Sequence, residues 1–389
     1  MIADSPPLDG VTVLDLSRVL AGPWCTQTLA DLGATVIKIE NPQGGDDTRA
    51  WGPPFAGGES AYFLCANRGK KSVVVDFTMP AGQEIIRDLA SQADVLVENF
   101  KAGGLEKYGL GEAQLRELNK RLIYCSISGY GRDVPDAARP GYDYVIQAEA
   151  GLMAINGEID GPPMRVGVAV ADLFTGMAAT QAILAALIAR TRDGVGQHID
   201  MALHDCQIAM LANVGSAALI TGEEPPRLGN GHATIVPYQV FSTSDRPIVV
   251  ACGNDRQFQA ICLEVFKRPD LAADPRFARN RDRVAHRQAL DDILAPLFLL
   301  KSAHDWLESL RAAGVPGGEV RTVRAALASD STRDRGMVVE VDHPTVGKLS
   351  LIGSPLKFSR TKTREPIAPP LLGQHSDEIL GQLPPSSYE

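Results

Sequence analysis

The chain has 389 residues, which is long enough to bury a large core and to form two domains. Its composition, 44% apolar and 22% charged, is that of an ordinary globular protein. Acidic residues outnumber Lys and Arg by 47 to 38, and the net charge of −9 argues against a nucleic-acid-binding protein.

Strands and helices alternate through the first third of the chain. Residues 11–17, "VTVLDLS", form a continuous apolar run with one acid, which is typical of a strand buried on both faces. A helix over 22–33 that ends at Gly33 and a strand over 35–40 follow. The alternation continues with strands and helices at 71–77, 80–92, 94–100, near 112–119 and at 121–128. This order predicts an α/β protein with a Rossmann-like open parallel sheet.

Polar residues stand at or just beyond the ends of these predicted strands. They are Asp15, Glu40, Asp76 and the residues at 98–100 and 128–131. Because ligands of open parallel sheets bind at the carboxyl ends of the strands, we expect the binding site at this edge.

One acid lies in an otherwise nearly apolar stretch at 165–180, "RVGVAVADLFTGMAAT". The valines alternate over 166–170 as in a buried strand, and small, helix-tolerant residues follow from Leu173. Asp172 therefore stands at a predicted helix start. It is either an N-cap, whose carboxylate accepts backbone hydrogen bonds, or a functional residue.

Other features bear on location. Residues 173–189 carry no charge, but they are Ala-rich and short for a membrane span, so they are predicted to form a core helix rather than to meet a membrane. The six cysteines are scattered, which indicates reduced thiols and a cytoplasmic protein. The start, "MIADSPPLDG", lacks the pattern of a secretory signal.

The texture of the sequence changes near 222–237, which is rich in Gly and Pro and is predicted to be a linker or binding loop. We predict a large domain over 1–222 and a smaller α/β domain over 226–325. The segment 326–389 is predicted to return to the large domain, which is therefore built from both ends of the chain.

Three common chemistries find little support. The residues His198, Asp200, His204 and Asp205 are ligand types, but the two histidines are six apart and do not align on one helix face, so no metal is predicted. No GxSxG elbow is present, and "SISGYG" lacks its first glycine. No GxGxxG follows the first strand, so no dinucleotide or other cofactor is predicted.

Several long strings resemble the class III CoA-transferase family, which includes formyl-CoA transferase, carnitine CoA-transferase and acyl-CoA racemases. The strings are "PLDGVTVLDLSRVLAGPWCTQTLADLGATVIKIENPQGGDDTR", "NRGKKSVVVDF", "ADVLVENFKAGGLEKYGL", "ISGYG" and "APPLLGQHSDEIL". The resemblance implies an interlocked homodimer whose active site lies between the large domain of one chain and the small domain of the other. It also implies acyl-CoA and carboxylic acid substrates.

The resemblance also implies roles for individual residues. Asp172 falls on the catalytic aspartate, which forms mixed-anhydride and aspartyl-CoA thioester intermediates. The positive end of the following helix is expected to keep it ionised. Tyr142 and Asp143 match positions beside the thioester, and the loop Gly229, Asn230 and Gly231 is the candidate source of oxyanion donors. The matching CoA-binding positions are Arg18, Leu20, Ala21, Asn41, Asp76, Asn99, Phe100 and Lys107.

Some alternatives stay open at this point. Lys107 either contacts phosphates or is a solvated surface lysine. An acyl-CoA racemase of this family carries a histidine base in a "RAGHD"-like string, whereas this chain has "RPGYD". Because an ordinary phenol has a pKa of about 10, Tyr142 is a poor base and transfer is favoured over epimerisation. A non-catalytic CoA-binding protein is the third possibility. The string "RLGNGHATIVPYQVF" resembles transferases that act on succinyl-CoA and other dicarboxylates.

Overall fold

The computed structural model describes residues 5–383, and the chain divides into two compact units. The first unit contains the chain up to Leu152, Val166–Ala212 and the chain from Asp330 onward. The second contains Met153–Arg165 and Asn213–Ser329, so it takes in three short segments, 153–165, 213–225 and 326–329, beside the predicted 226–325.

A six-stranded parallel sheet forms the centre of the first unit, in the order β5-β2-β1-β6-β7-β8. The strands are β1 (Thr12–Asp15), β2 (Thr35–Glu40), β5 (Lys70–Val74), β6 (Val95–Glu98), β7 (Ile123–Ser128) and β8 (His198–Ala202). Numbered within the sheet, this order is 3-2-1-4-5-6, the doubly wound arrangement in which chain direction along the sheet reverses between β1 and β6. The predicted Rossmann-like parallel sheet is confirmed.

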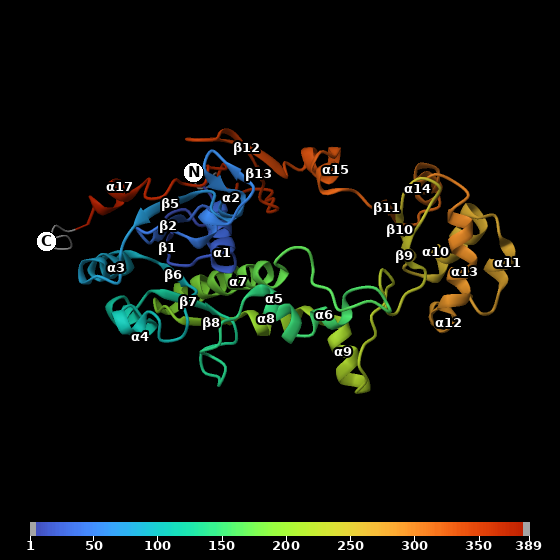
Figure 1. Cartoon of the computed structure of the whole chain (residues 1–389), viewed down its shortest axis with the longest axis horizontal. Coiled ribbons are helices and arrows are strands. Elements are labelled where there is room, and N and C mark those ends of the chain that lie inside the picture. The colour runs from blue at the N-terminus through green and yellow to red at the C-terminus, as the bar shows by residue number, and fades with distance from the viewer. Residues whose placement is uncertain (1–4, 384–389) are drawn as a thin grey trace. The chain divides into compact units, whose positions relative to one another are not determined.

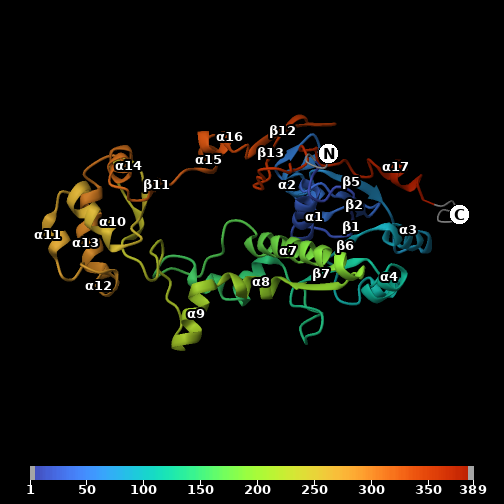
Figure 2. The same cartoon turned by 180° about the vertical axis from the view of Figure 1, so that it is seen from behind.

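Helices cover both faces of the sheet, because successive strand residues point to opposite sides. Val13 packs on one side with α1 (Ala21–Asp31) and α7 (Val170–Asp193), which lie side by side in Figures 1 and 2. Leu14 packs on the other side with α3 (Pro80–Gln92), α4 (Glu112–Leu118) and α17 (Ser376–Leu380). The sheet is therefore buried on both faces, as its continuous apolar strands indicated.

The alternating valines at 166–170 were interpreted wrongly as a strand. Residues 162–166 have no regular structure, and the Val168 side chain is 57% exposed. The sixth strand is β8 instead, whose polar residues His198 and Asp200 hid its pattern. It is the outermost strand and only partly buried, so charged side chains are tolerated there.

Helix α7 is long and apolar enough to cross a membrane by length and composition alone. One stripe of it is buried against α1. Gly176 lies at that contact, where an added Cβ would stand 2.6 Å from the carbonyl oxygen of Ala21. The helix ends at Gly194 in the left-handed conformation. These contacts agree with the predicted core helix.

Shorter elements and the C-terminal segment complete the first unit. The backbone N–H of His375 donates to Ser72, and Val74 donates to the Ser376 hydroxyl, so the segment before α17 binds the edge strand β5. The remaining elements are η1 (Asp47–Ala50), β3 (Phe55–Ala56), β4 (Glu59–Ser60), α2 (Ala61–Ala66), η2 (Glu106–Tyr108), α5 (Asp143–Glu149), α8 (Leu203–Met210), α16 (Asp330–Asp334), β12 (Val338–His343) and β13 (Gly347–Ile352).

The second unit has its own core, in which Phe241, Phe298 and Trp306 pack as an aromatic cluster. Its antiparallel sheet has the order β11-β10-β9. The elements are α9 (Ala212–Thr221), β9 (Tyr238–Phe241), β10 (Ile248–Ala251), α10 (Asp255–Ala260), η3 (Ile261–Val265), α11 (Pro269–Ala273), α12 (Asn280–Ala285), α13 (Arg287–Phe298), α14 (Ala303–Ala312), β11 (Gly317–Glu319) and α15 (Val323–Leu327); α6 (Leu152–Ile155) begins at the boundary.

Candidate active site

A cavity of about 530 Å³ opens in the first unit at the carboxyl ends of β1, β6 and β7. Val19 follows β1, Asn99 follows β6 and Gly129 follows β7, and all three line it. The reversal of strand order between β1 and β6 separates the loops that follow them, which creates a crevice at this edge. The site therefore lies where a doubly wound sheet offers one.

The loop that carries Tyr142 crosses the end of β7 very closely. A Cβ added to Gly129 would stand 2.7 Å from the Cα of Gly141, so a side chain on Gly129 would force the two backbones apart. The crossing brings Tyr142, which is 62% exposed, to the cavity wall directly before α5. The motif "SGYG" and the motif "RPGYD" thus meet in space.

Asp172 lies in the first turn of α7, but it does not cap the helix. The N-cap position is Ala169, which has no side chain able to cap. Asp143 of α5 does this work instead, because its Oδ1 accepts the backbone N–H of Ala171 at 2.8 Å and that of Asp172 at 3.4 Å. Gln147 holds the other oxygen of Asp143 at 2.7 Å. The N-cap interpretation of Asp172 is therefore wrong.

The carboxylate of Asp172 therefore does not bind the helix end, and Asp172 is one of the residues that line the cavity. Within the described residues it accepts no hydrogen bond. Burial, and then the charge of Asp143, raise the pKa of Asp172 to about 7. The expectation that the helix end keeps this group fully ionised is not met, because burial and a like charge oppose it.

Tyr62 of α2 is a neighbour of Asp172 that the sequence analysis missed. Burial, and then the charge of Asp172, raise the pKa of Tyr62 to about 12. Its ring packs edge-on against Trp51, with 5.3 Å between the ring centroids. No short motif surrounds these two residues, so only the fold reveals them.

Cations and aromatic rings gather elsewhere on the cavity wall. The four cations Arg18, Lys101, Lys107 and Arg139 face two acids, Asp47 and Asp172, a formal sum of +2 with Asp172 ionised. Phe77, Phe100 and Tyr108 form edge-to-face pairs with centroid separations of 5.6 and 5.7 Å. Lysine 107 is part of this wall, and its Nζ lies 4.7 Å from the Tyr108 ring centroid.

The cavity brings together eight of the predicted site residues: Arg18, Leu20, Ala21, Asn99, Phe100, Lys107, Tyr142 and Asp172. Asp143 lies behind the wall. Asn41 and Asp76 do not line the cavity: Asn41 accepts from the Gln43 N–H, and Asp76 accepts from Thr78. Lys101, Arg139, Phe77 and Tyr108 also line the cavity and were not predicted, although Arg139 opens the "RPGYD" string.

The loop Gly229, Asn230 and Gly231 belongs to the second unit. The backbone N–H of Gly231 already donates to the carbonyl of Leu228 at 2.8 Å. Of the three backbone N–H groups in this loop, those of Gly229 and Asn230 have no hydrogen-bond partner within the described residues. These two are therefore the better oxyanion donors in this loop.

Two of the acids at strand ends serve the fold rather than the cavity. Asp15 is fully buried; burial opposes its ionisation, but Lys70 and Lys38 lower its pKa to about 2. Glu40 is bound by Arg49 at 2.8 Å. Of the metal-ligand candidates, His198 bonds Ser126 and Asp200 accepts from Arg132. Across residues 5–383 no three His, Cys, Asp or Glu side chains are grouped as a metal site.

Comparison with known proteins bears on the family to which the chain belongs. The family described as CoA-transferase family III matches residues 8–376. A succinate–glutarate CoA-transferase of Agrobacterium fabrum is 46% identical over 384 residues, 97% of this chain and 96% of that protein. A succinyl-CoA:glutarate CoA-transferase of Homo sapiens is 45% identical over 377 residues, 97% of this chain and 86% of that protein.

Solved structures agree as well. The crystal structure of a CAIB/BAIF family protein from Brucella suis superposes with a TM-score of 0.87 at 45% identity and covers 98% of this chain and 100% of that chain. The match to the family spans nearly the whole chain, and both relatives exceed 40% identity over almost all of it. The resemblance found in the sequence is confirmed: the protein belongs to CoA-transferase family III.

Proposed function

We propose that this CoA-transferase moves CoA from an acyl-CoA to a carboxylic acid through covalent intermediates on Asp172. The observation that carries the proposal is the Asp172 carboxylate, which has no hydrogen-bond partner in residues 5–383 and faces a cavity lined by cations. A carboxylate that is neither capping a helix nor paired is available as a nucleophile. A purely structural acid would be bonded, as Asp143 is.

CoA is proposed to occupy this cavity. Its phosphates carry several negative charges, which the side chains of Arg18, Lys101, Lys107 and Arg139 would attract. Its adenine ring would pack against the apolar edge formed by Phe77, Phe100 and Tyr108. The thioester end would then reach toward Asp172 and Tyr142 at the other part of the wall.

The proposed reaction needs neither a metal nor a redox cofactor. The Asp172 carboxylate attacks the thioester carbonyl, which gives a mixed anhydride and releases CoA as a thiolate. The thiolate attacks the aspartyl carbonyl, which gives an aspartyl-CoA thioester and releases the first carboxylate. The acceptor carboxylate then attacks this thioester and releases the CoA thiolate again. Attack of that thiolate on the new acyl group yields the product and restores Asp172.

Backbone donors are proposed to stabilise the tetrahedral oxyanions of these steps. The Gly229 and Asn230 N–H groups are the candidates, because Gly231 already donates to Leu228. In an interlocked homodimer such donors come from the partner chain, and we propose that assembly here. The exposed apolar residues Phe174, Met177 and Ile188 of α7 support an assembly that covers them.

The substrate class is proposed to be dicarboxylic. Both relatives described above carry succinate or succinyl-CoA and glutarate in their names, at 46% and 45% identity. We therefore propose succinyl-CoA or another dicarboxylyl-CoA as the donor. Transfer is favoured over racemisation because no histidine lines the cavity among the described residues. The six cysteines, all without disulfide partners in the described chain, support a cytoplasmic location.

Trapping of the intermediate tests the proposal. The enzyme is incubated with succinyl-CoA alone and then treated with hydroxylamine or borohydride, which attack thioesters and anhydrides but not carboxylates. Peptide mass spectrometry should locate the modification to Asp172. Normal turnover without a trappable adduct at Asp172 would indicate direct transfer and contradict the covalent route.

Substitution of the nucleophile gives a second test. We expect Asp172→Asn to lower kcat by about a thousandfold or more with the fold intact, because the covalent route is closed. The control is Asp193→Asn at the other end of the same helix, which is exposed and should keep wild-type rates. Activity of Asp172→Asn above about a tenth of wild type contradicts the assignment.

A further inference from the structure

The turn that follows β1 is strained at one residue of the cavity wall. Val19 has a φ of 71°, in the left-handed region that a β-branched residue rarely adopts. Such a conformation is costly for a residue with a branched Cβ and persists only where surrounding contacts hold it. Because Arg18, Val19 and Leu20 all line the cavity, the strain fixes part of its shape.

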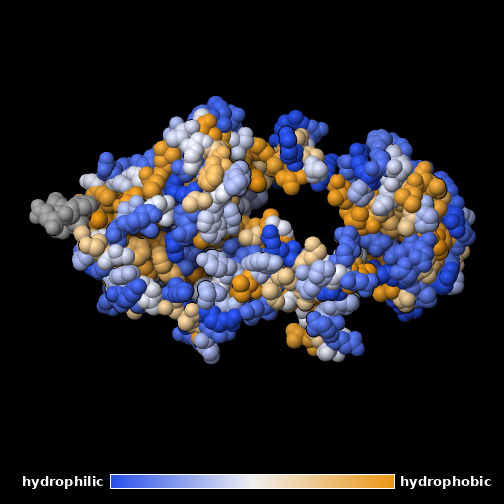
Figure 3. Space-filling view, viewed as in Figure 1, coloured by the Kyte–Doolittle hydropathy of each residue, from blue (hydrophilic) through white to orange (hydrophobic). Residues whose placement is uncertain are grey.

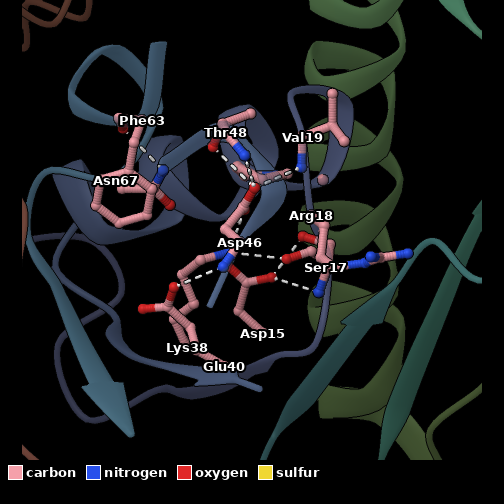
Figure 4. Close-up of polar contacts among 12 residues, drawn as sticks. Asp15, Ser17, Arg18, Val19, Lys38, Glu40, Asp46, Thr48, Phe63 and Asn67 are labelled. Atoms are coloured by element: carbon pink, nitrogen blue, oxygen red, sulfur yellow. Dashed lines mark hydrogen bonds and ion pairs between the residues drawn. The ribbon is translucent and has the colours of Figure 1, made fainter. Parts of the chain in front are cut away.

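Two polar side chains hold the backbone of this turn. Asn99 accepts the Arg18 N–H at 2.8 Å and donates to the Arg18 carbonyl at 2.7 Å. Asp46 accepts the Val19 N–H at 3.2 Å, as Figure 4 shows. Asn99 itself lines the cavity, but Asp46 does not. Asp46 therefore acts on the turn from behind.

Asp46 is fixed in turn by Lys38 of β2. The Lys38 Nζ lies 2.9 Å from Asp46 Oδ2, and both side chains are fully buried. The same ammonium donates to the Ser17 carbonyl at 2.8 Å. In Figure 4 Lys38 lies between the Ser17 backbone and Asp46. One cation thus ties Ser17, the residue before the turn, to the acid that holds Val19.

Burying this ion pair is expected to add little to the folding stability of the protein. Removing two charges from water costs several kcal/mol for each ion, and apolar residues of the same volume often serve stability as well or better. What an ion pair adds is direction, because its atoms must meet at fixed distances. Here the two charged groups contact two backbone groups next to the strained residue. Lys38 donates to the Ser17 carbonyl, and Asp46 accepts the Val19 N–H.

We propose that Lys38 and Asp46 are positioning residues that hold the turn Arg18–Leu20 in the geometry that binds CoA. Neither side chain touches the cavity; both act through the backbone of the turn. The inference rests on the proposed function, since it assumes that CoA occupies this cavity. Loss of the pair should therefore weaken CoA binding without altering the chemistry at Asp172.

The first test compares two buried acids. Asp46→Asn is measured by calorimetric titration with CoA and by kinetics with succinyl-CoA and glutarate. We expect the CoA dissociation constant and the KM for succinyl-CoA to rise about tenfold or more, which is 1.4 kcal/mol. The kcat and the KM for glutarate should stay within about threefold of wild type.

The matched control is Asp31→Asn, which breaks the buried ion pair of Asp31 with Arg68 at the far end of α1. It should lower the unfolding temperature but leave the CoA dissociation constant unchanged. A purely structural role for Asp46 predicts the same outcome for both variants. If Asp46→Asn fails to fold, Lys38→Met/Asp46→Asn removes both charges and takes its place in the comparison.

A double-mutant cycle supplies a readout that general destabilisation does not move. Glycine adopts a positive φ without the steric penalty of a Cβ. In a Val19→Gly background the turn therefore depends less on its hydrogen bond to Asp46. We expect Asp46→Asn to weaken CoA binding clearly less in that background than in wild type. Equal effects in the two backgrounds, or an unchanged CoA affinity of Asp46→Asn, overturn the positioning role. Failure of the wild-type protein to bind CoA overturns the proposed function itself.

Discussion

At the start of α7 two aspartates have different roles: Asp143 binds the end of the helix, and Asp172 lines the cavity. Asp143 accepts the backbone N–H groups of Ala171 and Asp172 and so takes the place of an N-cap. The Asp172 carboxylate is thereby left unbonded and close to a like charge. Since a carboxylate that is easily ionised is a weak nucleophile, a pKa near neutrality gives Asp172 more basicity while much of it remains ionised at physiological pH.

This arrangement predicts a pH dependence. In the proposed reaction only the ionised carboxylate attacks the thioester, so kcat/KM should fall about tenfold per pH unit below the Asp172 pKa of about 7. In Asp143→Asn the like charge is gone, and the fall should move to lower pH. Kinetics from about pH 5 to about pH 9 measure both. Asp193→Asn is the control and should keep the wild-type profile; a profile flat across neutrality would contradict the raised pKa.

The sequence singled out Asp172 but not the residues that leave its carboxylate unbonded and raise its pKa. Asp143 was assigned a place beside the thioester, and its role as the cap of another helix depends on α5 and α7 meeting, which no local pattern shows. In the same way Asp15 was expected near a ligand, yet it pairs with Lys70, 55 positions away. Long-range pairing of this kind cannot be predicted from spacing.

Among the elements, those with strong local signals were predicted best. The sequence analysis placed the strand at 35–40 and the helix at 80–92 where β2 and α3 lie, because one is an apolar run and the other begins at Pro80. It failed for β8 and for the supposed strand at 166–170, because burial at the edge of a sheet is decided by neighbours rather than by alternation.

The contact of α1 with α7 joins a helix that lines the cavity, at Ala21, to the helix that carries Asp172. Gly176→Ala gains about 1 kcal/mol of helix propensity, but its Cβ would stand 2.6 Å from the Ala21 carbonyl, and such overpacking costs about 1–3 kcal/mol. We expect lower stability to urea. Because Ala21 lines the cavity, we also expect a higher KM for succinyl-CoA.

The control for this contact is Gly318→Ala in the second unit, where an added Cβ meets nothing within 4 Å. It should change neither the urea midpoint nor the KM by a measurable amount. Equal behaviour of the two variants would show that the close approach of α1 and α7 does not matter to the site.

On the scale of the whole molecule, each unit leaves apolar surface without a partner. Phe174, Met177 and Ile188 of α7 are 38%, 52% and 67% exposed. In the second unit Leu219 and Ile220 of α9 are 90% and 84% exposed, and Figure 3 shows hydrophobic atoms gathered over this helix. Exposed apolar residues grouped on one helix often mark a surface that a partner covers.

The proposed interlocked homodimer makes a prediction about mass. Light scattering should report about twice the chain mass of 41.6 kDa, even at nanomolar dilution, because threaded chains cannot separate without unfolding. Ile188→Asp should reduce the yield of this species, whereas Arg192→Asp, a polar position on the same helix, should not. A fraction of monomer that rises steadily as the protein is diluted would contradict a threaded dimer.

The C-terminal segment has a consequence for biosynthesis. Strand β5 is the outermost strand of the sheet, and its Ser72 and Val74 bind the segment at His375 and Ser376. That segment emerges from the ribosome long after β5 does. Until that segment has been made, a nascent chain therefore exposes a strand edge able to pair with neighbouring chains. We expect a chain that stops before His375 to leave this edge open and so to aggregate, rather than merely to lose activity.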